Sequence, residues 1–363
     1  MMRYQKIKKK IKIFFSSKNY WLKLITCHSI FFTIPNFVYS QACLSFDNEL
    51  KNGIACVASY KNILYAGGGF DKKSGSNSNY IAKWAQSKWV PLEQEIDGPV
   101  SSMIVFNSEL FIVSNFTKTG SFNSSYISKW NGNQWSVVGN KDDTINGEIY
   151  SIIVHKDKLI IGGNFTGIGA KPISYIACWD GNSWTSIGGK INGPVQKISS
   201  FKNDLYVVTR ADSLGQGIYS TIFLLENNLW KTHGSLNSVK FVEITSLQVY
   251  DNGLFVGGQT SSGNKNLSCH NLVKWNSAEM ECYDFSNTGN GVLDIFLHNN
   301  KLFIACYFLP PLSKNPEFKI IAWDGVKQIA DNKINVFYDE IKKIFVFENK
   351  LYLIKGGCVC ALD

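Results

Sequence analysis

The sequence predicts an all-β fold: a seven-bladed β-propeller of four-stranded antiparallel blades, with the last blade closed by both chain termini. Two recurring markers support this prediction. A Leu followed by an aromatic residue or Ile returns at intervals of 46 to 49 residues, at Leu64, Leu110, Leu159, Leu205, Leu254, Leu302 and Leu351. A second marker follows about 20 residues later, at Trp84, Trp130, Trp179, Leu225, Trp275 and Trp323. A period of this length built from short strands is typical of propeller blades.

The third repeat shows the four strands most clearly. Ile149–Val154 is rich in β-branched residues and predicts the first strand, and Leu159–Phe165 predicts the second. Tyr175–Trp179 and Ser183–Ile187 predict the third and fourth, separated by the turn Asp180-Gly181-Asn182. Because polar turns between β-rich runs are hairpin signals, we expect each repeat to be an antiparallel meander.

The repeats are predicted to begin near residues 53, 100, 149, 195, 244, 292 and 341. The seventh repeat ends at Asp363 after two or three strands. We expect the segment Cys43–Phe46, near the other end of the chain, to supply the missing strand. A blade shared in this way closes the ring and removes two open sheet edges.

Residues 1–40 are predicted to be a secretory signal peptide. Eight basic residues from Arg3 to Lys23, with no acidic residue, precede an uncharged stretch and small residues before Gln41. This layout is typical of exported proteins. The alternative is a signal anchor that stays in the membrane, although the stretch is short for a span and contains Pro35. We therefore divide the chain into a signal peptide, 1–40, and one propeller domain, 41–363, that is secreted or held in the cell envelope or periplasm.

The net charge of +9 is concentrated in the leader. Eight of the 37 basic residues lie there, which leaves 29 basic and 28 acidic residues in the rest of the chain. Binding to nucleic acid requires a basic face that neutralises phosphates. A nearly neutral domain with a single Arg predicts no nucleic-acid partner. The membrane is expected as a partner only if the leader is uncleaved.

Eight cysteines follow the leader, and an even number in an exported protein predicts disulfides. Cys269 and Cys282 flank one predicted hairpin, so we pair them. A disulfide between an N-terminal and a C-terminal group would staple the ring shut, and these groups are Cys43 with Cys56, and Cys358 with Cys360. Cys178 and Cys306 lie in apolar strands, and for them the alternative is a free buried thiol.

The repeat unit resembles a known class of propeller repeats. It reads Leu-aromatic-x-Gly-Gly-x-Phe, a loop, Tyr-Ile-Ala-x-Trp, Asp-Gly-Asn and a second Trp, and the similarity spans about residues 53 to 357. The unit is similar to the Kelch and galactose-oxidase class, and closer to the secreted repeats of fungal cortical polarity-marker proteins and their bacterial relatives. It departs from Kelch in having Trp where Kelch has Tyr, and in a shorter following hairpin. The resemblance implies a binding scaffold, and no set of residues here matches the copper ligands of galactose oxidase.

No cofactor, metal site or catalytic set is predicted. The histidines show no zinc-ligand spacing, and neither a Gly-x-Ser-x-Gly elbow nor a phosphate loop occurs. Asp180 and Asp324 recur as Asn131 in a sister repeat, so hairpin turn chemistry explains them better than catalysis. The repeated Trp residues fit packing between blades better than a sugar-binding ladder. For the acidic cluster of Asp142-Asp143 and Glu148, a solvated loop is the main interpretation and a calcium site the alternative.

The variable loops are predicted to form the binding face. We name the strands of a blade a to d in chain order. In a meander, the a–b and c–d turns share one end of the blade, and the b–c loops and d–a connections share the other. The b–c loops are long and unlike one another, over residues 71–79, 117–125, 210–219, 260–270 and 309–318. Function on a rigid scaffold concentrates in such loops.

Seven residues on that face are candidate ligand-binding residues. Arg210 is the only Arg after the leader and can hold a carboxylate or phosphate with two parallel bonds, with a local salt bridge to Asp212 as the alternative. The other candidates are apolar or acidic, namely Asp212, Phe122, Tyr307, Phe308, Asp142 and Asp143. Packing within the blades is the alternative for the three aromatic residues.

Together these features predict an exported, monomeric scaffold that binds a protein or glycan through its b–c and d–a loops, without catalysis. The main alternative is an extracellular hydrolase or lyase that degrades a polymer. It requires carboxylates or histidines that converge at the mouth of the central channel, and the sequence shows no such set. A membrane-anchored surface-marker protein is the third hypothesis.

Overall fold

The structure is a computed structural model. It describes residues 53–69, 80–85, 88–92, 96–201, 203–212, 218–232, 241–260, 271–275, 280–282, 291–309, 315–325, 328–329, 340–355 and 358–362. The chain divides into two compact units, Met1–Tyr39 and Ser40–Asp363. The leader and the segment Cys43–Phe46 lie outside the described residues. No helix long and apolar enough to cross a membrane occurs in the described part of the chain.

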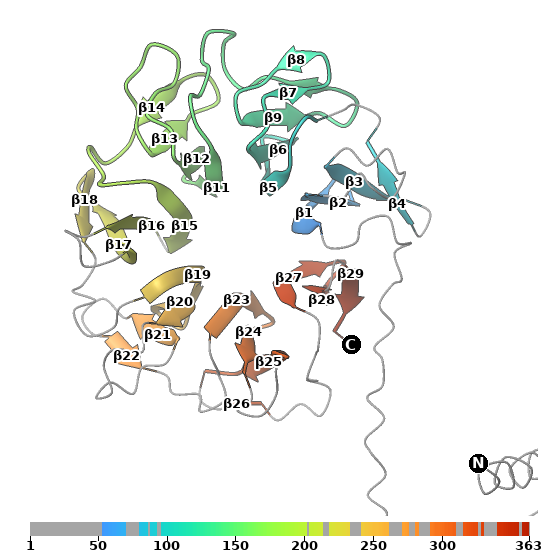
Figure 1. The fold of residues 1–363 in the computed structure, drawn as a ribbon, viewed down its shortest axis with the longest axis vertical. Helices are drawn as coiled ribbons and strands as arrows, with labels where there is room; N and C mark the ends of the chain where they lie inside the picture. Colours follow the sequence, from blue (N-terminus) through green and yellow to red (C-terminus); the bar gives the residue numbers. More distant parts are fainter. Residues whose placement is uncertain are drawn as a thin grey trace, which may run out of the picture. The chain divides into compact units, whose positions relative to one another are not determined.

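The strands of the second unit form seven antiparallel sheets around a ring, which confirms the seven-bladed β-propeller (Figure 1). Each sheet is a meander in chain order. The a strands lie nearest the centre and are β1 (Ile54–Tyr60), β5 (Val100–Phe106), β11 (Ile149–His155), β15 (Val195–Phe201), β19 (Phe241–Tyr250), β23 (Gly291–His298) and β27 (Ile341–Phe347). The b strands are β2 (Ile63–Gly68), β6 (Glu109–Ser114), β12 (Lys158–Gly163), β16 (Asp204–Asp212), β20 (Gly253–Thr260), β24 (Lys301–Phe308) and β28 (Lys350–Lys355).

The outer strands complete each blade. The c strands are β3 (Ile81–Ala85), β9 (Ile127–Trp130), β13 (Ile176–Trp179), β17 (Ile218–Glu226), β21 (Leu272–Trp275), β25 (Glu317–Trp323) and β29 (Cys358–Ala361). The d strands are β4 (Lys88–Pro91), β10 (Trp135–Ser136), β14 (Trp184–Ser186), β18 (Leu229–Thr232), β22 (Met280–Cys282) and β26 (Gln328–Ile329). Blade 7 has three strands among the described residues. A small hairpin of β7 (Lys118–Thr119) and β8 (Phe122–Asn123) lies in the b–c loop of blade 2.

The a–b turns are two-residue turns with a left-handed backbone. Both central residues have positive φ, for example 47° and 61° at Asn107 and Ser108, and 49° and 54° at Lys156 and Asp157. This is the geometry of a type I′ turn, whose twist matches that of the flanking strands. Asn, Asp and Lys therefore set a tight hairpin at this end of the blade.

The c–d turns depend on a side-chain hydrogen bond. The Oδ1 atom of Asp180 accepts bonds from the backbone N–H groups of Asn182 and Ser183, at 2.9 and 2.8 Å. In blade 2 the Oδ1 atom of Asn131 accepts the equivalent bonds from Asn133 and Gln134. The interpretation of Asp180 as a turn residue is thus confirmed, because Asn fills the same role without a charge.

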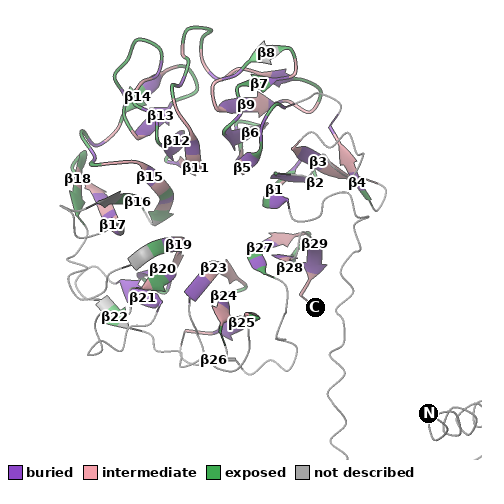
Figure 2. Cartoon of the chain, in the orientation of Figure 1, coloured by how far each residue is buried: buried purple, intermediate pink, exposed green. Residues whose placement is uncertain are grey.

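The hydrophobic core consists of seven clusters, one at each interface between adjacent blades. The Trp residues of strands c and d form cross-strand pairs that face the preceding blade: Trp130 and Trp135 have ring centroids 5.0 Å apart and pack against blade 1, and Trp179 and Trp184 pack against blade 2. Trp184 is 1% exposed. Figure 2 shows buried segments in the strands and exposed loops between them. The packing interpretation of the Trp repeat is therefore confirmed.

The Gly pair at the end of strand b serves two separate contacts. A Cβ atom on Gly162 would lie 2.4 Å from Cγ1 of Val195 in blade 4, so this Gly admits the next blade. A Cβ atom on Gly163 would lie 2.0 Å from the backbone oxygen of Glu148 in the same blade. Strand a has a β-bulge between Ile149 and Ser151 opposite this pair. In blade 3, Gly thus stands where backbone and side chains approach closely.

The ring closes by packing blade 1 against blade 7. Ile54, Leu64 and Trp89 of blade 1 form one cluster with Phe345 and Ile354 of blade 7. Strand β29, near the C-terminus, pairs with β28. The fourth strand predicted for this blade falls on residues outside the described part of the chain.

The prediction that Cys56 forms a disulfide is wrong. Its thiol is free and buried, and Sγ lies 3.7 Å from the Gly67 carbonyl oxygen and 3.8 Å from that of Val100. The sulfur thus points into the packing between blades 1 and 2. Cys178 and Cys306 are also buried thiols outside any disulfide, which agrees with the alternative interpretation given for them.

The other predicted disulfide residues lie mostly outside the described side chains. Cys360 is disulfide-bonded, and the described side chains do not include its partner. Four cysteines have no described side chain, namely Cys43, Cys269, Cys282 and Cys358. The pairing of Cys269 with Cys282 stays a prediction.

Candidate binding face

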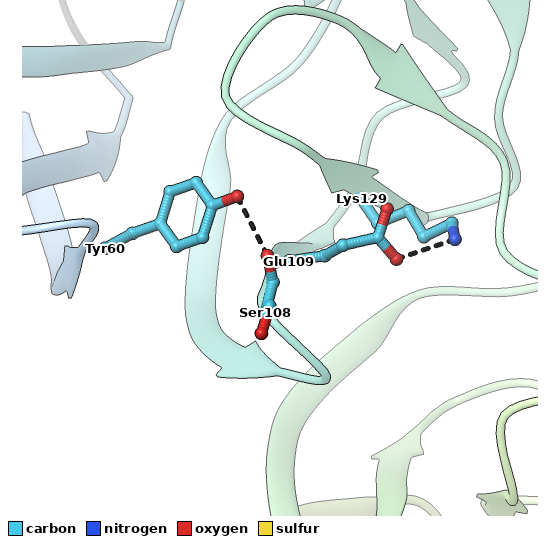
Figure 3. A network of polar contacts seen from close by, with 4 residues as sticks. All are labelled: Tyr60, Ser108, Glu109 and Lys129. Carbon is cyan, nitrogen blue, oxygen red and sulfur yellow. Dashed lines mark hydrogen bonds and ion pairs between the residues drawn. The ribbon is translucent and has the colours of Figure 1, made fainter.

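The two ends of the propeller differ in how they are built. The end formed by a–b and c–d turns is held by hydrogen bonds between neighbouring blades. Oη of Tyr60 donates to the carbonyl oxygen of Ser108 in the a–b turn of blade 2, at 2.9 Å (Figure 3). Oη of Tyr250 makes the same bond to Asn300 in blade 6, at 3.2 Å. The last residue of strand a thus ties each of these blades to the next one.

Further polar contacts reinforce the turn end. Nδ1 of His155 lies 2.7 Å from Oγ of Ser200 in blade 4. Nζ of Lys61 donates to the carbonyl oxygen of Asn131 in blade 2 at 2.8 Å. Burial, and then the nearby charge of Lys156, lower the pKa of His155 below its usual value. This histidine is therefore a neutral structural residue at neutral pH.

A pocket of about 220 Å³ lies between blades 2 and 3 at the turn end, lined in part by Phe106, Asn107 and Gly181. Its charged groups are Glu109 and Lys129, which form an ion pair of 2.7 Å (Figure 3). Both side chains are about one-quarter exposed, at 26% and 30%. Because the two charges compensate each other, the pocket offers little to a charged ligand.

At the opposite end, formed by b–c loops and d–a connections, Asx side chains order the described loops of blades 2 and 3. Asp97 precedes strand a of blade 2, and its Oδ1 atom accepts bonds from the N–H groups of Thr117 and Lys118 in the b–c loop, at 2.8 and 2.9 Å. Asn146 makes the equivalent contacts to Thr166 and Gly167 in blade 3, at 2.8 and 3.0 Å. These bonds join each b–c loop to the preceding d–a connection.

The carboxylate of Asp97 is stabilised by this arrangement. Burial acts to raise its pKa, but the hydrogen bonds from Thr117 and Lys118 outweigh burial and lower the pKa below the usual value. Sequence reasoning missed Asp97 and Asn146. The signal that would have found them is an Asp or Asn followed by Gly three residues before strand a, at Asp97-Gly98 and Asn146-Gly147.

The inner strands carry one further set of equivalent residues. The residue that follows the strand-a bulge occupies the same register position in every blade, and we call these residues the channel ring: Cys56, Ser102, Ser151, Lys197, Ser246, Asp294 and Lys343. In three blades the ring side chain accepts a hydrogen bond from a backbone N–H of the next blade. Ser151 accepts from Ile198, Ser246 from Ile295, and Asp294 from Ile344.

The d–a connection between blades 2 and 3 contains the predicted acidic candidates. Asp143 is half-buried, and its Oδ2 atom accepts bonds from the backbone and side-chain nitrogens of Asn140, at 3.0 and 3.3 Å. Asp142 is exposed. In the described part of the chain, no group of three or more His, Cys, Asp or Glu residues could hold a metal ion. Asp143 thus has an observed role in shaping the loop.

The remaining candidates lie further into strands than the sequence indicated. Arg210 is exposed and lies in β16, which extends to Asp212; the backbone partner of Arg210 is Ser220 of β17. Residues 210–212 and 218–219 are therefore strand, where a loop was predicted over 210–219. The side chain of Asp212 is not among those described, so its salt bridge with Arg210 stays a prediction. Phe122 lies in β8, also without a described side chain.

Tyr307 and Phe308 end strand β24 and are half-buried. Tyr307 packs with the cluster between blades 6 and 7, and Phe308 with the cluster between blades 5 and 6. Nζ of Lys319 lies 4.3 Å from the centre of the Phe308 ring. Both aromatic residues thus make packing contacts within their blade and its neighbours. No described contact brings them together with Arg210 or Asp142.

Three solved structures with similar folds are distant from this chain in sequence. YCF48 bound to D1 peptide has a TM-score of 0.57 and 13% identity, over 86% of this chain and 92% of that chain. Sqt1 of Saccharomyces cerevisiae has a TM-score of 0.45 and 11% identity, over 87% and 97%. The β-propeller domain of the trilobed protease from Pyrococcus furiosus has a TM-score of 0.44 and 11% identity, over 85% and 90%. No family model and no curated protein matches the chain. The similarity to YCF48 supports the propeller fold.

Proposed function

We propose that this protein is an exported propeller that binds a protein partner at its b–c and d–a end and performs no catalysis of its own. The observation that carries the proposal is the contrast between the two ends. Tight turns and inter-blade bonds such as that of Tyr60 occupy one end, whereas long, dissimilar loops occupy the other. Variable loops on a rigid scaffold are the usual place for recognition.

A protein partner is favoured over a glycan for two reasons. The similar propeller YCF48 was solved bound to D1 peptide. In addition, the Trp residues Trp130, Trp135, Trp179 and Trp184 are buried between blades and offer no open stacking surface to a sugar. The repeat also resembles those of polarity-marker proteins. This resemblance supports the proposal, because it implies a binding scaffold. A polymer-degrading enzyme is the competing function.

Photo-crosslinking tests the binding face. Peptides that bind the full chain are first selected from a random library. A photoreactive residue is then placed at Lys118 or Ala170, both exposed in b–c loops, and as matched controls at Gln134 or Asn182, both exposed in c–d turns. We expect the peptides to crosslink from the first pair and not from the second. Equal or stronger crosslinking from the c–d turns contradicts the proposal, and release of cleaved polymer by the purified protein supports the enzyme instead.

Export is tested separately. N-terminal sequencing of the exported protein is expected to begin at Gln41, in agreement with a cleaved leader. A chain that begins with the leader and stays with the membrane fraction supports the anchored surface protein. For the disulfide of Cys360 we propose Cys43 as the partner, because Cys56 is free. Peptide mass spectrometry without reduction is expected to recover these two cysteines in one linked peptide.

A further inference from the structure

Two of the seven channel-ring residues break the pattern of the others. Five are small and uncharged or acidic, and three of these, Ser151, Ser246 and Asp294, accept a hydrogen bond from the next blade. Lys197 in blade 4 and Lys343 in blade 7 cannot do this, because an ammonium group has no acceptor. The two lysines thus give up the structural contact made at the same register position in sister blades.

Lys197 lies on the innermost strand of blade 4, and charged groups from three other blades act on its ammonium group. Burial, then the charge of Lys343, lower the pKa of its ammonium group, while Asp294 and Glu243 act in the opposite direction. These three residues belong to blades 7, 6 and 5, and blade 7 lies three blades away around the ring. A side chain on the inner strand of blade 4 reaches such neighbours only through the central channel. The Lys197 side chain is exposed to solvent, although the surrounding protein partly desolvates its ammonium group.

Neither lysine forms an ion pair within 4.0 Å with a described carboxylate. Asp294, the acidic residue of the ring, already accepts bonds from Oγ of Ser246 at 3.1 Å and the N–H of Ile344 at 2.8 Å. Two ammonium groups that repel each other in a confined channel cost free energy. Such a cost is characteristic of sites that await a ligand of opposite charge.

The lysines lie toward the proposed binding face. Each is the third residue of its strand a, Val195–Phe201 or Ile341–Phe347. Strand a is entered from the d–a connection, so its first residues lie nearest the b–c and d–a end. No channel-ring residue is aromatic. The ring therefore suits recognition of charge, not stacking of sugar rings.

We propose that Lys197 and Lys343 bind a carboxylate group of an acidic peptide segment that enters the channel from the b–c and d–a end. This inference rests on the proposed function and names the chemistry of its partner. Each lysine acts as a mobile point charge with up to three donors, so the pair holds one carboxylate between two blades on opposite parts of the ring.

The test uses fluorescein-labelled hexaglutamate and, as an uncharged control, hexaglutamine, with binding to the full chain followed by fluorescence anisotropy at low salt. We expect hexaglutamate to bind and hexaglutamine not to bind. In the double variant Lys197→Met, Lys343→Met, binding is expected to weaken about tenfold or more, since charge-assisted hydrogen bonds are lost.

A matched control keeps the net charge equal. The double variant Lys158→Met, Lys350→Met removes two exposed lysines at the a–b end of strands β12 and β28. Its hexaglutamate affinity is expected to change less than about twofold, as for exposed, screened charges. The variant Lys197→Arg, Lys343→Arg keeps the charge and is expected to keep binding. Circular dichroism and urea unfolding verify that each variant is folded.

Three results overturn the inference: equal hexaglutamate binding by the wild type and the Lys197→Met, Lys343→Met variant, equal loss in the two Met double variants, or no hexaglutamate binding at all. Inorganic phosphate that competes as well as glutarate at equal concentration also overturns the assignment to a carboxylate. Failure here leaves the proposed function standing if selected peptides still crosslink from Lys118. Conversely, hexaglutamate binding can depend on the two lysines while selected peptides do not crosslink from Lys118. That result contradicts only the part of the proposed function that assigns binding to the loops.

Discussion

The Gly pair of blade 3 gives a sharp test of how the blades are packed. We consider Gly163→Ala, with Gly162→Ala for comparison and Gly69→Ala as the control. The new Cβ at 163 would lie 2.0 Å from the backbone oxygen of Glu148, so the bulge itself must move. At 162 the contact is 2.4 Å from Cγ1 of Val195, a side-chain atom. At 69 the nearest atom is 3.9 Å away.

The magnitude follows from these contacts. Overpacking a close contact costs about 1–3 kcal/mol, and a rigid backbone partner favours the upper part of that range. The loss of unfolded-state freedom from Gly to Ala returns about 0.4–1 kcal/mol. In blade 2, Ser114 occupies the register position equivalent to Gly163. The blade backbone can therefore accommodate a side chain at this position, which limits the cost of the substitution. We therefore expect Gly163→Ala to lower the free energy of unfolding by about 2 kcal/mol, Gly162→Ala by about 1 kcal/mol, and Gly69→Ala to leave it unchanged or slightly raised.

Urea unfolding followed by Trp fluorescence measures these differences, because the Trp pairs lie at the blade interfaces. The midpoint is expected to fall while the slope of the transition stays constant, since the surface exposed on unfolding is the same. If Gly163→Ala unfolds at the same urea concentration as Gly69→Ala, the close backbone contact does not limit this blade and the reasoning is refuted.

Four further predictions concern individual side chains. Tyr60→Phe removes the bond to the neighbouring turn and is expected to lower the free energy of unfolding by about 1 kcal/mol in the same assay, whereas no change would show that the bond is replaced by water. Burial raises the pKa of the Cys56 and Cys306 thiols to about 12, so both are expected to resist a thiol reagent at about pH 8 until the protein unfolds, and reaction in the folded state contradicts their burial. The folded protein holds these two protons more tightly than the unfolded chain does. Their contribution to stability is therefore complete below the ordinary thiol pKa of 9.0 and declines as the pH rises toward about 12, and urea midpoints at increasing pH measure this decline. Asp180→Asn is expected to keep the melting temperature and Asp180→Ala to lower it, since Asn131 makes the same turn in blade 2, and equal melting of both variants argues against the side-chain bond.

The periodic features of this fold were predictable from sequence. The Leu and Trp markers report buried positions that every blade needs, and the structure starts strand a at Ile149 and Val195 as the repeat indicated. The a–b and c–d turns were also predictable, because Asn, Asp and Gly adopt positive φ angles more readily than other residues.

Features that arise from contacts between repeats were harder to predict from the sequence. Tyr126 and Tyr175 adopt φ angles of 65° and 67° just before strand c, a conformation for which sequence rules favour Gly or Asn. The carbonyl oxygen of Tyr175 accepts a bond from Gly163 at 2.9 Å, which helps to hold it there. The lysines of the channel ring were missed for a related reason: their significance appears only when equivalent positions are compared around a closed ring.

The seam between blades 1 and 7 has a consequence for biosynthesis. Six of the seven inter-blade clusters join neighbours in the chain, so they can form while the ribosome is still translating later blades. The apolar face formed by Ile54 and Trp89 has to wait for Phe345 and Ile354, the last blade to emerge. Until then the nascent protein is an open arc with an exposed apolar face. Such a face favours aggregation, so chaperones or rapid completion of the ring protect the protein.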